Sequence, residues 1–67
     1  MNSIARKVAF ENRYNAEMIM NILAHWTGVT TDQDWDNEKT IYTFEDDGSQ
    51  IIISGPDVEV IDQPETK

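Results

Sequence analysis

The stretch Thr40–Ser54, TIYTFEDDGSQIIIS, decides the fold because it has the composition of two β-strands joined by a tight turn. β-Branched and aromatic residues dominate residues 40–45 and 50–54, and these residue types favour strands. Asp47 and Gly48 lie between the two runs. An Asp-Gly pair in this position is a strong hairpin signal, because glycine readily adopts the positive φ that the turn needs. We therefore predict an antiparallel hairpin.

A third strand is predicted after this hairpin. Residues 55–57, GPD, favour a turn, and residues 58–62, VEVID, alternate between two faces. Val58 and Val60 would lie on the core side, while the other sheet face would present Thr43, Glu45, Glu59 and Ile61. Residues 63–67 are polar and include a proline, so we expect a disordered tail after a single domain of residues 1–62.

Residues 3–26 have the spacing of an amphipathic helix. One arc of the helix contains Ile4, Val8, Tyr14, Met18, Ile19, Ile22, Leu23 and Trp26. Glu11 and Asn15 also fall inside this arc, where burial without a partner is costly. The helix could therefore end or kink near residues 10–12, or it could continue with its first turns projecting beyond the core. We favour one long helix, which leaves three apolar residues partly exposed: Ile4, Val8 and Phe10.

The predicted fold is α+β, with one long N-terminal helix packed on a three-stranded antiparallel β-meander (αβββ). The helix would contribute Tyr14, Met18, Ile22, Leu23 and Trp26 to the core. The sheet would contribute Tyr42, Phe44, Ile51 or Ile52, Ile53, Val58 and Val60. A chain of 67 residues without cysteine has only this small core to stabilise it.

Residues 29–39, VTTDQDWDNEK, are predicted to form an acidic loop between the helix and the first strand. Trp35 is unusual among so many carboxylates. Its indole could close one end of the core, or it could be an exposed contact residue, because tryptophan is enriched at binding hot spots.

The sequence contains no motif that indicates a metal site or a catalytic centre. Asp32, Asp34 and Asp36 have the opening spacing of a calcium-binding EF-hand loop, but Asn37 and Thr43 stand where that loop needs glycine and glutamate. The single histidine, His25, has no neighbouring nucleophile motif, and the three glycines are isolated. We therefore predict a protein that is not an enzyme and that uses no metal or cofactor.

Negative charge is the most distinctive property of the chain. Its net charge is −8, and the halves differ: residues 1–28 have three basic and two acidic residues, while residues 29–67 have two basic and eleven acidic residues. Such a field repels nucleic acid and anionic membranes and favours basic protein surfaces. No apolar run is long enough for a membrane span, and no secretory signal is apparent, so we expect a cytoplasmic protein.

In size, charge and lack of catalytic motifs the chain resembles the small acidic proteins with which bacteriophages disarm restriction enzymes, CRISPR effectors or RNA polymerase of the host. The resemblance implies an inhibitor that mimics nucleic acid and occupies the basic surface of a nucleic-acid-binding protein. The candidate binding residues are Asp32, Asp34, Trp35, Asp36, Glu38, Glu45, Asp46 and Asp47. The alternative is a structural or regulatory protein that forms a homodimer, or docks on an assembly, through Ile4, Val8 and Phe10, with charge serving only solubility.

Overall fold

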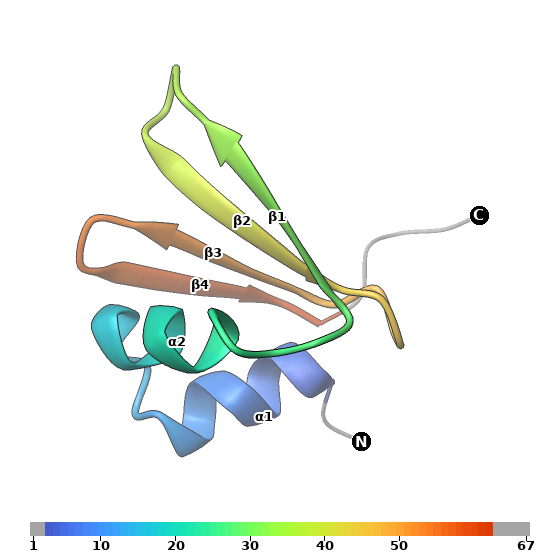
Figure 1. Cartoon of the computed structure of the whole chain (residues 1–67). Helices are drawn as coiled ribbons and strands as arrows, with labels where there is room; N and C mark the ends of the chain where they lie inside the picture. Colours follow the sequence, from blue (N-terminus) through green and yellow to red (C-terminus); the bar gives the residue numbers. More distant parts are fainter. Residues whose placement is uncertain (1–2, 63–67) are drawn as a thin grey trace.

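The computed structural model describes residues 3–62. Its elements, in chain order, are α1 (Ile4–Glu11), α2 (Ala16–Leu23), β1 (Val29–Asp34), β2 (Lys39–Phe44), β3 (Gln50–Ser54) and β4 (Asp57–Ile61). The strands form one antiparallel sheet in the order β1-β2-β3-β4, and the two helices lie together on one side of it (Figure 1). The predicted tail, residues 63–67, lies outside the described residues.

The prediction of one long helix on three strands is wrong in two respects. The helix is interrupted after Glu11, as in the alternative that we did not favour, and the segment predicted as an acidic loop contains β1. Cross-strand pairing with β2 runs from Val29 opposite Phe44 to Asp34 opposite Lys39. This pairing outweighs the low strand preference of aspartate. The strands predicted at 40–45, 50–54 and 58–62 correspond to β2, β3 and β4.

The interruption between α1 and α2 is made by two consecutive residues in the left-handed conformation, Arg13 at φ 58° and Tyr14 at φ 52°. The Tyr14 N–H donates to the Ala9 carbonyl at 2.7 Å, which closes the end of α1. Asn15 then caps α2 by accepting from the Met18 N–H at 2.9 Å. Of the two polar residues that were unsuitable for the buried arc of a long helix, Glu11 therefore ends α1 in an exposed position and Asn15 caps α2.

The core lies between the helices and the inner face of the sheet. Its buried members are Ala5, Val8, Ala9, Ala16, Ile19, Leu23, Tyr42, Phe44, Ile51 and Ile53. Trp26 closes one end with an edge-to-face contact to Phe44, with ring centroids 5.7 Å apart. Three residues predicted for the core are instead exposed: Tyr14, Met18 and Ile22. The break rotates α2 relative to α1, so a single helical arc does not describe both helices.

The N-terminus of α1 is bound by the β2–β3 turn. The Ile4 N–H donates to Asp47 Oδ2 at 2.9 Å, and the Ala5 N–H donates to Ser49 Oγ at 3.0 Å. Ser49 is fully buried, and its hydroxyl donates to Asp47 Oδ1 at 2.6 Å. Ser3 caps the helix locally by accepting from the Arg6 N–H at 3.1 Å. The free N–H groups of the first turn are thus satisfied partly from within the helix and partly from the sheet.

The end of β4 is joined to α1 by charge. Asp62 accepts from Arg6 Nε at 2.7 Å and from Arg6 Nη2 at 2.6 Å, and Ser3 Oγ donates to the same carboxylate at 2.9 Å. The hydrogen bonds from Arg6 and Ser3 lower the pKa of Asp62 to about 2. This two-point pairing connects the first helix with the last strand.

We expect Asp47→Ala to lower the free energy of unfolding by about 1–2 kcal/mol, because it removes a helix cap and leaves the Ser49 hydroxyl without its acceptor. The exposed neighbour Asp46 provides the control, since Asp46→Ala removes the same charge without touching the cap. Urea unfolding followed by circular dichroism measures both variants. Equal stability of the two variants would show that the cap contributes nothing.

The Arg6–Asp62 pair should make stability depend on pH in acid. Because folding lowers the pKa of Asp62 from 3.8 to about 2, the stabilisation is complete above pH 3.8 and is lost as pH falls through 2. Asp62→Asn and Arg6→Gln should each remove this part of the pH dependence, and the double variant should behave like either single variant. Thermal unfolding between pH 5 and about pH 2 tests this. Additive effects of the two substitutions would contradict it.

Candidate functional site

The two faces of the sheet differ in what covers them. Side chains alternate along each strand, and directly paired residues share a face. Tyr42 on β2 and Ile51 on β3 are paired, buried and on the side of the helices. We call the opposite side the open face, and its residues are Thr30, Asp32, Asp34, Lys39, Ile41, Thr43, Gln50, Ile52, Ser54, Asp57, Glu59 and Ile61.

Carboxylates lie on both edge strands of the open face, and Ile41 and Ile52 occupy its centre. One row across the sheet reads Asp32, Ile41, Ile52, Glu59, from β1 to β4. The two carboxylate-bearing residues of this row are separated by three strand spacings, or about 14 Å. Asp34 and Asp57 repeat the arrangement two residues further along the edge strands. Glu45 extends it at the other end, where Thr30 Oγ1 donates to Glu45 Oε2 at 3.2 Å.

Charge is segregated between the two layers. Among the described residues, Lys39 is the one basic residue of the open face, beside four acidic residues in the strands and a fifth, Glu45, which follows β2 on the same side. The helical layer carries Arg6, Lys7 and Arg13 against Glu11 and Glu17, a net charge of +1. The charge difference between the halves of the sequence therefore becomes a difference between two faces of the folded molecule. A face of this kind attracts basic ligands.

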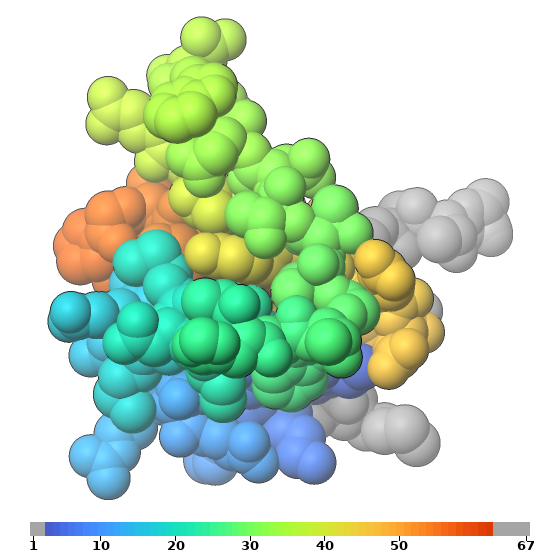
Figure 2. All heavy atoms as spheres, viewed as in Figure 1, coloured from blue at the N-terminus to red at the C-terminus, as the bar shows by residue number. Residues whose placement is uncertain are grey.

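The loop between β1 and β2, residues 35–38, forms the second part of the site. We call it the tip, because it projects beyond the rest of the molecule (Figures 1 and 2). The Asp34 carboxylate accepts from the Asn37 side-chain amide at 3.0 Å and from the Asn37 N–H at 3.3 Å. These hydrogen bonds lower the pKa of Asp34. The tip therefore has a defined shape, and it holds Trp35 at 77% exposure, which leaves the indole free for a partner.

The predicted binding residues are divided among three places. Asp32, Asp34 and Glu45 lie on the open face; Trp35, Asp36 and Glu38 lie at the tip; and Asp46 is exposed in the β2–β3 turn. Asp47 is separate, because its carboxylate caps α1. Burial acts to raise the pKa of Asp47, but hydrogen bonds from Ile4 and Ser49 outweigh it and hold this pKa below its usual value.

Asp57 and Glu59 were not among the predicted binding residues. Alternation along VEVID did place Glu59 on the face away from the core, which was the available signal. The role of Glu59 could not be predicted without β1. The open face has carboxylates on both edges only because β1 forms a fourth strand that carries its own.

The residues predicted for the alternative dimer face do not form one exposed surface. Val8 is only 4% exposed and Ile4 is half-buried, because the sheet turn holds this part of α1 against the core. Phe10 is 72% exposed. The expected exposure of Val8 is therefore wrong, and Phe10 alone remains fully available on that helix.

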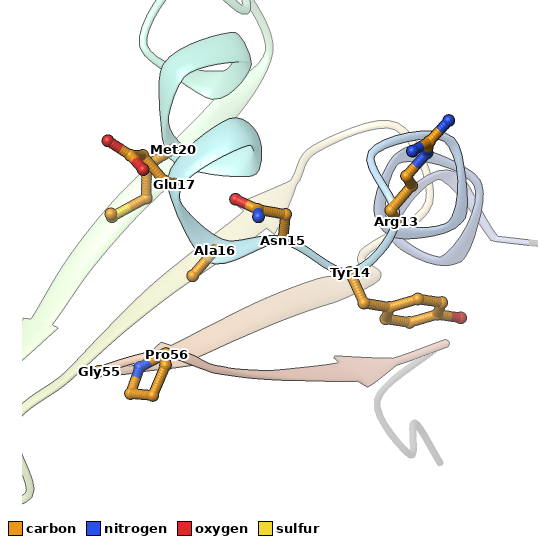
Figure 3. A pocket seen from close by; sticks show the side chains of 8 residues that line it. All are labelled: Arg13, Tyr14, Asn15, Ala16, Glu17, Met20, Gly55 and Pro56. Carbon is orange, nitrogen blue, oxygen red and sulfur yellow. The ribbon is translucent and has the colours of Figure 1, made fainter.

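A hollow of about 610 Å³ lies at the break between the helices, beside the β3–β4 turn (Figure 3). Arg13, Tyr14 and Glu17 line it on the helical side, and Gly55 and Pro56 line it on the sheet side. It contains one basic and one acidic side chain and no histidine or nucleophile. Within residues 3–62, no group of three or more histidine, cysteine or acidic side chains is arranged to hold a metal ion.

Comparison with known proteins adds no functional assignment, since no family model, curated protein or solved structure matches the chain. Neither α1 nor α2 has the length and apolar character needed to cross a membrane. The open face and the tip are therefore the features of this molecule that bear on its function.

The environment of Trp35 can be tested by fluorescence quenching. The chain has two tryptophans, so a Trp26→Phe variant reports Trp35 alone. With each ion scaled to its quenching of free N-acetyltryptophanamide, we expect caesium to quench Trp35 at least about twice as strongly as iodide at low salt, because the carboxylates around the tip attract cations. In the matched Trp35→Phe variant, half-buried Trp26 should respond weakly to both ions. Equal quenching of Trp35 by the two ions on this scale would contradict the description of the tip.

Proposed function

We propose that this chain is a non-enzymatic binding module that occupies the basic surface of a protein that handles nucleic acid. One observation carries the proposal: both edges of the open face carry carboxylates, and the tip continues the negative charge beyond the β1 edge. A surface of this kind is suited to a groove lined with lysine and arginine.

The spacing of the carboxylates supports nucleic acid as the ligand that this module replaces. Alternate residues on an edge strand are about 7 Å apart, and the two edges are about 14 Å apart. The open face thus presents two lines of negative charge, as a duplex presents two phosphate strands. A protein groove that accepts phosphates on both sides would accept this arrangement. Blocking that groove would inhibit the protein without any chemical reaction.

Charge would set the rate and orientation of encounter more than the final affinity. Each exposed ion pair contributes only about 0.2–1 kcal/mol, while electrostatic steering raises association rates by about 10–1,000-fold. Trp35 would add a desolvated contact at the tip. We place this activity in the cytoplasm, and in the cytoplasm of the host cell if the chain is encoded by a phage.

The test is affinity capture from a bacterial lysate, with elution by increasing salt and competition by duplex DNA. We expect nucleic-acid-handling proteins among those captured, and we expect duplex DNA to displace them. The pair Asp32→Asn and Glu59→Gln should lower the salt concentration needed for elution. The control pair Glu11→Gln and Glu17→Gln removes the same charge from the helical layer and should leave elution unchanged.

Two results would contradict the proposal. Equal elution of both charge variants would show that only net charge matters, and capture insensitive to both salt and DNA would show that the contact is apolar. The second result would favour the alternative of a protein that docks through an apolar surface, with Phe10→Ser as the substitution to examine next.

A further inference from the structure

Three isoleucines of the open face have no place in the core. Ile41, Ile52 and Ile61 are half-buried, yet they are outside the cluster that the helices cover. Ile41 and Ile52 are directly paired across β2 and β3, and Ile61 lies two residues beyond Glu59, the partner of Ile52. Ile41 and Ile52 therefore lie side by side at the centre, with Ile61 as the diagonal neighbour of Ile52 on β4, and we call the three residues the isoleucine strip. A solvated sheet face ordinarily carries polar residues at these positions.

The surroundings of the isoleucine strip are those of a binding interface. An apolar centre with a polar rim is the usual anatomy of protein contacts. Here the rim is acidic on both sides, with Asp32 on β1 and Glu59 on β4 at the ends of the row that contains Ile41 and Ile52. A partner element must therefore be apolar along its middle and basic along both flanks.

Resting on the proposed function, the geometry points to a more specific partner element: we propose that the open face seats an amphipathic α-helix of the target protein. Its apolar stripe would pack on the isoleucine strip, and its lysine or arginine side chains would reach the edge carboxylates on either side. An α-helix with side chains is about 10–12 Å wide, which fits between edges about 14 Å apart. The sheet would then be covered by helices on both faces.

An extended segment fits this surface less well. Its backbone N–H and C=O groups would lie over isoleucines that offer no hydrogen bonds, whereas a helix satisfies its own backbone. A second copy of the chain also fits poorly. Two open faces packed together would bring carboxylates from both copies into one interface, and each copy has a net charge of −8.

The experiment is a nuclear magnetic resonance titration of the isotope-labelled full chain with three synthetic peptides of about 15 residues. The first is a leucine–lysine peptide with leucine at helical spacing, the second has the same composition in a scrambled order, and the third is oligolysine. We expect the first to bind at least about tenfold more tightly than the others, because it alone places apolar side chains on one face. The largest shifts should occur at Asp32, Ile41, Ile52 and Glu59.

Two variants identify the surface. Ile52→Thr keeps a β-branched side chain on β3 and should weaken binding of the leucine–lysine peptide by about fivefold or more. Ile22→Thr, on the exposed side of α2, is the matched control and should change binding by less than about twofold. Ile41→Thr serves in place of Ile52→Thr if thermal unfolding shows that the latter variant is not folded.

The outcomes separate this inference from the proposed function. Equal binding of all three peptides, weakened by Asp32→Asn and Glu59→Gln, would overturn the helix and leave the charge-based function standing. Shifts centred on α2 would also overturn the helix proposal. So would shifts of the isoleucine strip that appear when the chain is concentrated without peptide. The second of these would identify another copy as the occupant. If the peptide titration gives one of these results and the capture experiment also fails, both the helix proposal and the proposed function are overturned.

Discussion

The attachment of α1 to the β2–β3 turn is the constraint on which the structure depends. An isolated helix of eight residues is not stable in water, so α1 needs tertiary contacts. Asp47 and the buried Ser49 supply them by accepting from the first two N–H groups of the helix. The same turn that joins β2 to β3, residues 45–49, thus determines where the helical layer begins. Once α1 is fixed on one face, the other face is left uncovered.

The sequence predicted those parts of the fold that depend on neighbouring residues. Alternation of apolar residues and the Asp-Gly turn located β2, β3 and β4. The segment that became β1 begins with strand-favouring residues but ends in Asp-Gln-Asp, whose aspartates disfavour a strand, and its pairing with β2 makes it one. The helix break depends on left-handed Arg13 and Tyr14, whose side chains give no local signal for that conformation. The polar residues inside the apolar arc were the only indication.

For the candidate site, residue types were predictable and their arrangement was not. The concentration of acidic residues in the second half indicated a charged surface. Trp35 is exposed, as the interpretation of this residue as a contact residue required. Asp47 and Asp46 are adjacent and chemically identical, yet one caps a helix and the other faces solvent. That difference depends on contacts with Ile4, which is 43 residues away along the chain. No local pattern contains this information.

The carboxylates of the edge strands have a further consequence, which concerns aggregation. Among residues 3–62, β1 and β4 each have a strand partner on one side only, and such edges are templates for pairing with other chains. If two copies paired through β1, Asp32 and Asp34 of each would lie close to those of the other, and the repulsion would oppose growth into a continuous sheet. The residues proposed to bind a basic partner thus also oppose self-association of the chain through its edge strands. Selection for one property would preserve the other.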